Sequence, residues 1–331
     1  QPLGWNHPEL KKYESHLGKV ALHKIANSDM YSEVYADFTD KFSQIACPQF
    51  DHFFFISGGA LAVENALKAA FDWKMRKNPT VAVNRLDIIH FKQAFHGRTG
   101  YTMSLTNNGG IDDHLNIKTK FYPKFDWSRV TNPKILHPLD VHKAQNIESI
   151  AIKEIEAALK SHNVAAIIIE PIQGEGGDNH FRGEFLQKLR ELCDQNESLL
   201  IFDEVQTGMG LTGRWWSFEH FNVTPDIICF GKKTQVCGIA VTDRIDEVAD
   251  NVFTVSGRIN STWGGNIVDM ARCTAILEIM QNENLVQNAA VVGEKFLKTI
   301  QELYLNYPGR ISNPRGRGFM LAFDLETPDE R

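Results

Sequence analysis

Short, wholly apolar runs recur along the chain between longer stretches of mixed polarity. Residues 199–202 and 227–230 are uninterrupted apolar runs, residues 165–169 form another, and segments 51–56 and 87–91 are similarly rich in branched and aromatic residues. Runs of this length and composition are typical of strands that are buried on both faces of a parallel sheet. We therefore expect a buried sheet at the centre of the molecule.

Segments with apolar residues at helical spacing separate or follow these runs. The pattern predicts helices over residues 31–45, 61–71, 150–159, 185–193, 267–281 and 285–304, and a last strand over residues 319–325. Strand and helix alternate from about residue 50 to about residue 240, which is typical of an α/β fold with a largely parallel sheet.

Two of the apolar runs end abruptly on charged residues. Asp203 follows the run at 199–202, and Lys232 follows the run at 227–230 after one glycine. In parallel sheets the reactive groups lie just past the carboxyl ends of the strands. A fixed acid and a fixed lysine in one crevice suit pyridoxal phosphate, because the lysine forms a Schiff base and the acid keeps the ring nitrogen protonated. This stretch alone equally allows a loop-capping Asp203 and a solvated Lys232.

Other side chains at strand ends are candidates for the same site. Residues 57–60, Ser-Gly-Gly-Ala, lie between a strand and a helix and form either a phosphate cup or a tight turn without a ligand. Phe95 can stack on a flat ring, and Arg98 offers two parallel donors to a carboxylate. His96 is more typical of a hydrogen-bonded core histidine than of a proton carrier. Glu175 lies between glycines and can swing, or it is a solvated surface acid.

The composition is that of an ordinary globular protein. Of 331 residues, 43% are apolar and 23% charged, and 35 basic against 41 acidic residues give a net charge of −6. With no basic cluster, no membrane-length apolar run and no signal peptide, we expect no nucleic-acid or membrane partner. The five cysteines lack C-x-x-C spacing, which favours reduced thiols in a cytoplasmic enzyme, and no metal is expected.

Taken together, the motifs resemble the class III aminotransferases of the fold-type I pyridoxal phosphate enzymes. The matching segments lie in order across nearly the whole chain, at residues 57–64, 95–99, 170–177, 202–208, 231–233 and 261–265. The amino-acid sequence at residues 58–74, 170–182 and 230–238 is most similar to the branch of the family that acts on L-lysine. Leu61 and Lys233 depart from the pattern of most members, and both departures fit that branch.

The resemblance implies a domain plan. It has an N-terminal segment at residues 1–35 and a large cofactor-binding domain at 36–265, whose mostly parallel sheet is sandwiched by helices. Residues 266–331 are expected to form a linking helix and the start of a smaller, apparently truncated α+β domain.

The resemblance also implies how the cofactor, pyridoxal 5'-phosphate, is bound. Asp203 is expected to pair with the pyridine nitrogen, and Lys232 to form the Schiff base and then to carry the proton. The remaining contacts are backbone N–H groups of Gly59 and Ala60 to the phosphate, Phe95 and Val205 on the two ring faces, Gln206 on the phenolic oxygen, and Thr262 on the phosphate of the neighbouring subunit of a homodimer.

The implied reaction moves the terminal amino group of L-lysine to 2-oxoglutarate, which gives 2-aminoadipate 6-semialdehyde and glutamate in a ping-pong cycle. Arg98 is expected to hold the substrate carboxylate. Glu175 is expected to neutralise a second arginine, beyond residue 331, and to swing away for the diacid. The alternatives are another ω-aminotransferase, acting on ornithine or 4-aminobutyrate, and a truncated, inactive cofactor-binding protein.

Overall fold

A seven-stranded sheet lies at the centre of the computed structural model, which describes residues 2–108 and 122–326. Across the sheet the strands follow the order β1 (His52–Ile56), β7 (Cys237–Val241), β6 (Ile227–Phe230), β5 (Leu199–Asp203), β4 (Val164–Ile169), β2 (Asp87–Phe91) and β3 (Arg129–Val130). Strand β7 is antiparallel to both of its neighbours, and the other adjacent pairs are parallel. The predicted α/β class with a mostly parallel sheet is confirmed.

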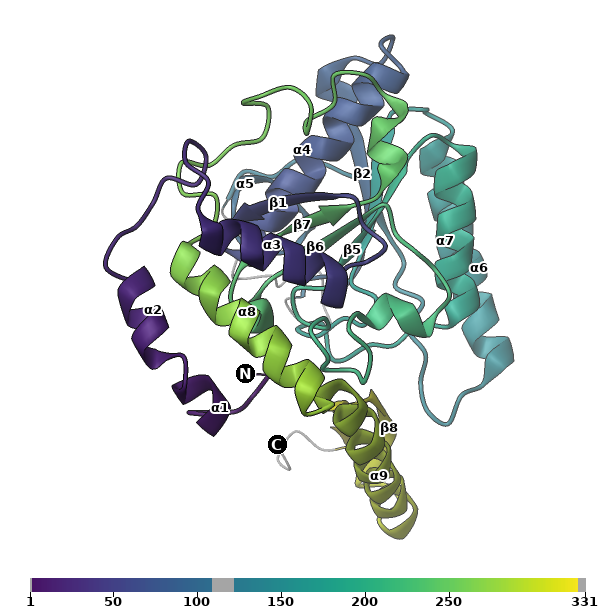
Figure 1. The fold of residues 1–331 in the computed structure, drawn as a ribbon. Coiled ribbons are helices and arrows are strands. Elements are labelled where there is room, and N and C mark those ends of the chain that lie inside the picture. The colour runs from purple at the N-terminus through teal and green to yellow at the C-terminus, as the bar shows by residue number, and fades with distance from the viewer. Residues whose placement is uncertain (1, 109–121, 327–331) are drawn as a thin grey trace.

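Helices cover both faces of this sheet (Figure 1). Successive residues of a strand point to opposite faces, so Leu199 and Ile201 pack in the apolar cluster of α4 (Gly59–Lys77), whereas Leu200 and Phe202 pack in the cluster on the other face. That second cluster is closed by α3 (Glu33–Ile45), α6 (Val141–Leu159), α7 (Gly183–Gln195) and α8 (Ile267–Asn282). The two layers fix the strand ends from which the candidate site residues project.

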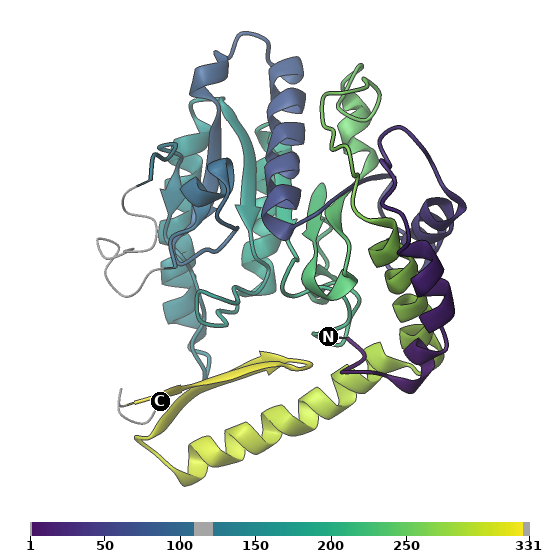
Figure 2. The same cartoon turned by 90° about the vertical axis from the view of Figure 1, so that its left-hand side faces the viewer.

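The chain continues beyond α8 into a helix and a hairpin that lie below the sheet in Figure 2. Helix α9 (Leu285–Asn306) packs on the antiparallel pair β8 (Ile311–Arg317) and β9 (Met320–Leu325). At the other end of the chain, α1 (Pro8–Lys11) and α2 (Glu14–Val20) pack along α8. The domain boundaries near residues 35 and 265 stay predictions.

Several elements differ from the sequence-based expectation. Helix α6 begins earlier than predicted, because the Asp140 side chain accepts a hydrogen bond from Lys143 N and caps the helix. Strands β3, β7 and β8 and helices α1, α2 and α5 (Gly100–Leu105) are not predicted by the pattern. In β7, Gly238 is required by close packing: a Cβ there would lie 2.3 Å from Phe54 O. No helix of the described residues is long and apolar enough to cross a bilayer.

Candidate active site

The ends of β5 and β6 open into one cavity of about 370 Å³. The two strands are parallel neighbours with Asp203 opposite Cys229, so the acid that ends β5 lies beside the turn that follows β6. The lining residues are Gly59, Ala60, Phe95, His96, Gly97, Arg98, Thr99, Glu170, Asp203, Val205, Gln206 and Lys232. The structure thus brings together all the predicted site residues except Glu175 and Thr262.

The Asp203 carboxylate is buried and held from two directions. One oxygen, Oδ2, lies 2.8 Å from His96 Nδ1, and the other, Oδ1, accepts a hydrogen bond of 3.1 Å from Val205 N. His96 is itself only 2% exposed. The prediction of a hydrogen-bonded core histidine is confirmed, but its pairing with Asp203 is not predicted, because 107 residues separate the two in the sequence.

Lys232 begins a short 3₁₀ helix, Lys232–Thr234, directly after Gly231. Its Nζ donates a hydrogen bond of 2.6 Å to Gln206 Oε1. Lys232 has a positive φ of 52°, which is uncommon for a residue with a side chain and often marks a functional turn. The side chain is exposed, so the amine can be reached from solvent.

The N-terminus of α4 forms one wall of the cavity. Gly58, with φ of 114°, makes the turn from β1, and Gly59 and Ala60 begin the helix and line the cavity. Amides in the first turn of a helix have no partner within the helix, and the helix dipole makes this end attractive to anions. A Cβ on Gly59 would lie 2.8 Å from Val205 Cγ1, so a glycine is needed for this close approach.

Glu170 is a lining residue to which the sequence analysis assigns no role. It follows β4 and is 4% exposed; its Oε1 accepts a hydrogen bond from Phe95 N at 2.9 Å and its Oε2 one from Gly174 N at 3.2 Å. Burial raises the pKa of Glu170 to about 7, although the nearby His96 opposes this. Glu170 is an acid directly after an apolar strand, which is the same signal that identifies Asp203.

The remaining predicted residues differ in where they lie. The guanidinium of Arg98 stands 5.1 Å from the Phe95 ring at the exposed edge of the cavity. Glu175 and Thr262 are exposed and do not line the cavity. The main-chain oxygen of Thr262 accepts a hydrogen bond from Ser28 Oγ at 3.1 Å. The swinging role of Glu175 and the role of Thr262 toward a second subunit stay predictions.

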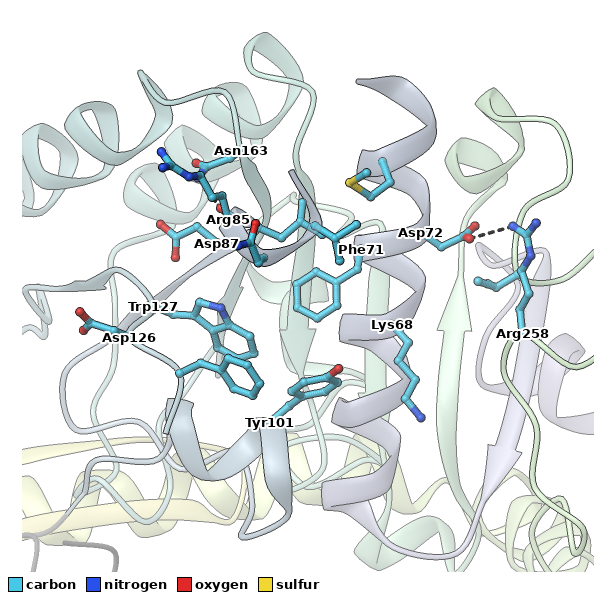
Figure 3. A pocket seen from close by; sticks show the side chains of 16 residues that line it. Lys68, Phe71, Asp72, Arg85, Asp87, Tyr101, Asp126, Trp127, Asn163 and Arg258 are labelled. Carbon is cyan, nitrogen blue, oxygen red and sulfur yellow. Dashed lines mark hydrogen bonds and ion pairs between the residues drawn. The ribbon is translucent and has the colours of Figure 1, made fainter. Parts of the chain in front are cut away.

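A larger cavity of about 960 Å³ lies alongside α4, away from these strand ends (Figure 3). Phe71, Tyr101 and Trp127 form an aromatic wall, and Asp72 pairs with Arg258 at 2.7 Å. None of the site residues predicted from the sequence lines this cavity. The smaller cavity, which is lined by both Asp203 and Lys232, is therefore the candidate active site.

The residues of the smaller cavity fit pyridoxal phosphate. A buried carboxylate, a reachable amine and a helix N-terminus line one space, whose volume is within the usual range for small-molecule sites. Because Gly59 lines the cavity and has no side chain, a phosphate can reach its backbone. In the described residues, no group of three or more His, Cys, Asp or Glu side chains is placed to hold a metal ion.

Comparison with known proteins gives a consistent result. The family model of the aminotransferases of class III matches residues 1–331. The L-lysine-epsilon aminotransferase of Mycobacterium tuberculosis is 47% identical over 99% of this chain and 74% of that protein. A solved lysine aminotransferase from M. tuberculosis, in the internal aldimine form, has a TM-score of 0.93 at 46% identity and covers 98% of this chain and 76% of that one. A 4-aminobutyrate aminotransferase of Dictyostelium discoideum is 32% identical over 100% of this chain and 70% of that protein.

Proposed function

Because the chain belongs to the class III aminotransferases, which depend on pyridoxal phosphate, we propose that it moves the terminal amino group of L-lysine to 2-oxoglutarate. The products are 2-aminoadipate 6-semialdehyde and glutamate. The observation that carries the proposal is that Asp203 and Lys232, from neighbouring strands, line one cavity. The choice of lysine is supported by the names of relatives that are 43–47% identical.

Apart from the contact assigned to Thr262 of a second copy, we assign every cofactor contact to a residue that lines this cavity. When bound, pyridoxal phosphate supplies an electron sink for the substrate carbon that loses its proton. Asp203 keeps the ring nitrogen protonated, and His96 holds Asp203 in place. Lys232 Nζ attaches the cofactor and carries the proton during transfer. The first amides of α4, at Gly59 and Ala60, bind the phosphate, while Phe95 and Val205 confine the ring and Gln206 binds its phenolic oxygen.

The terminal amine of lysine reacts only if its α-carboxylate is held far from the ring. Arg98 supplies a guanidinium at the exposed edge of the cavity, and among the described residues its recorded contact is the Phe95 ring rather than an acid. A guanidinium of this kind can bind a carboxylate through two parallel hydrogen bonds. We therefore assign to Arg98 the binding of the α-carboxylate of the amino donor.

Offering single donors to the cofactor-loaded enzyme tests the choice of substrate. We expect lysine to discharge the visible absorption band of the bound cofactor fastest, with ornithine and 4-aminobutyrate at least roughly tenfold slower, since misplacing one hydrogen-bonded carboxylate costs that much or more. Stopped-flow absorbance measures the three rates. If ornithine or 4-aminobutyrate discharges the band faster, that compound rather than lysine is the amino donor. If none of the three discharges it, the protein binds the cofactor without acting on these donors.

Replacement of Glu175 tests the two half-reactions separately. In Glu175→Ala we expect slower reaction with lysine but nearly unchanged reaction with glutamate, because the acid is needed only while the second arginine has no carboxylate to bind. Single-turnover rates for each substrate measure the effect. The control is Glu191→Ala, which removes an exposed acid outside the site, on α7. Equal losses in both half-reactions contradict the switch.

The proposed assembly is a homodimer in which Thr262 of each copy contacts the cofactor phosphate of the other. Its support is that Thr262 is exposed and lies outside the cavity of its own chain. The predicted cytoplasmic location is supported by five cysteines that form no disulfide.

A further inference from the structure

Two adjacent lysines follow β6, and both donate hydrogen bonds to Gln206. Lys232 Nζ donates to the side-chain oxygen of Gln206 at 2.6 Å, and Lys233 Nζ donates to its main-chain oxygen at 2.5 Å. Only Lys232 lines the cavity. Lys233 therefore contacts Gln206 from outside the site, at the backbone rather than at the group that faces the cofactor.

Lys233 is a half-buried cation, and in the described part of the chain its ammonium donates a hydrogen bond to a carbonyl rather than to an acid. Burying an ammonium group without an opposite charge is unfavourable unless hydrogen bonds compensate. Burial, and to a smaller degree the neighbouring Lys232, lower the pKa of Lys233 to about 8. A strongly perturbed lysine beside a ligand cavity is a candidate for a functional role.

The ionisable groups around Lys233 come from three elements. Lys232 precedes it on the same turn, and Glu204 follows β5 and opposes the lowering of the Lys233 pKa. Glu204 is engaged by Ser217 Oγ, at 2.9 Å, and by Phe218 N, at 2.8 Å. On β7, Cys237 packs against Gly231, and burial raises the pKa of its thiol, so it titrates above its ordinary range.

Gln206 is packed closely enough for its backbone position to matter. A Cβ on Gly174, at the start of the loop that carries Glu175, would lie 2.5 Å from the Gln206 amide carbon. The side chain of Gln206 is thus confined between this loop and Lys232. A small movement of its main chain would displace both its amide and the adjoining Val205, which lines the cavity.

We propose that Lys233 is a positioning residue for the cofactor: its ammonium fixes the main chain at Gln206 and so sets where the Gln206 amide and Val205 stand. The inference rests on the proposed function, because it takes Gln206 and Val205 as cofactor contacts. The hold is strongest when Lys233 is charged, which is below about pH 8, and it weakens as the proton is lost above that pH.

Cofactor affinity measured against pH tests this role without reference to turnover. Full-length protein stripped of cofactor is titrated with pyridoxal phosphate, and the Kd of each variant is divided by that of the wild type at the same pH, which cancels shared titrations. For Lys233→Met we expect a ratio of roughly 10 at pH 7, the worth of a charged hydrogen bond, falling toward one near pH 9. For Lys233→Arg, which stays charged, we expect a ratio near one at pH 7 and below one near pH 9.

Lys74→Met is the matched control. The ammonium of Lys74 also donates to main-chain oxygens, with its Nζ 2.7 Å from Glu197 O, but Lys74 is fully buried and lies near the C-terminal end of α4, away from the site. We expect its Kd ratio to stay near one at every pH. A Lys233→Met ratio that is near one at pH 7, or that does not change with pH, overturns the proposal; if Lys233→Met does not fold, Lys233→Gln replaces it.

The visible band of the bound cofactor separates this inference from the proposed function. We expect Lys233→Met to keep the band once saturated with cofactor, because Lys232 still attaches it. Loss of the band in Lys233→Met but not in Lys232→Ala would make Lys233 the attachment residue, and it would overturn both the positioning role of Lys233 and the attachment role of Lys232. Absence of lysine transfer by the wild type, with the expected Kd ratios, would overturn the proposed substrate alone.

Discussion

Lys232→Ala is expected to abolish the visible absorption band of the bound cofactor and to slow amino transfer by at least roughly 10⁴-fold. Proton transfer by a positioned side chain alone contributes about 10²- to 10⁴-fold, and covalent attachment of the cofactor is lost as well. In the structure, Lys232 Nζ is the amine that lines the cavity beside Asp203. Absorbance spectra and single-turnover rates with lysine measure the two effects.

The neighbouring lysine provides the comparison for this result. Lys233 lies outside the cavity, so Lys233→Met is expected to retain the band and most of the single-turnover rate when cofactor is saturating. A Lys232→Ala protein that keeps both the band and a rate within about tenfold of the wild type would show that the amine is supplied elsewhere.

Asp203→Asn is expected to lower the turnover number by roughly 10²- to 10³-fold, which is the usual effect of removing one preorganised electrostatic contact from an active site. The amide keeps the shape of the side chain. Its oxygen can accept the hydrogen bond from Val205 N, and its NH2 group can donate to His96 Nδ1 when the imidazole carries its proton on Nε2. What it loses is the negative charge that keeps the cofactor ring nitrogen protonated. The melting temperature is therefore expected to change little while turnover falls.

Asp87→Asn is the control for that change. Asp87 is the first residue of β2, so it lies at the amino ends of the parallel strands, whereas the site lies at their carboxyl ends. Its Oδ1 accepts a hydrogen bond from Ser128 N at 2.9 Å. It is expected to affect stability rather than turnover per bound cofactor. If Asp203→Asn turns over within about threefold of the wild type, less than half the free energy of one charged hydrogen bond, the ring nitrogen does not depend on Asp203.

The central part of the fold and of the site follows from local sequence patterns. Apolar runs that end on Asp203 and Lys232 are sufficient to place an acid and an amine at the same edge of a parallel sheet, because adjacent parallel strands end together. The small-residue turn at 57–60 likewise predicts a helix N-terminus facing the same space. In these cases a few neighbouring residues determine both the element and the direction of its end.

The features that are not predicted depend on contacts between distant residues. His96 reaches Asp203 only because the loop after β2 folds over β5, two strands away in the sheet order. Strand β7 enters between β1 and β6, where Gly238 allows the close approach of Phe54 O. The sequence around Lys233 does not predict that its ammonium donates a hydrogen bond to the Gln206 carbonyl. No local period or composition carries this information.

The central claim is that Lys232 and Asp203 bind the same pyridoxal phosphate, Lys232 through its amine and Asp203 through its carboxylate. Borohydride reduction of the cofactor-loaded wild type, followed by proteolysis and mass spectrometry, fixes the cofactor to whichever lysine holds it. We predict a single pyridoxyl-modified peptide with the modification on Lys232. Modification of Lys233 or of another lysine, or no modified peptide at all, would contradict the account.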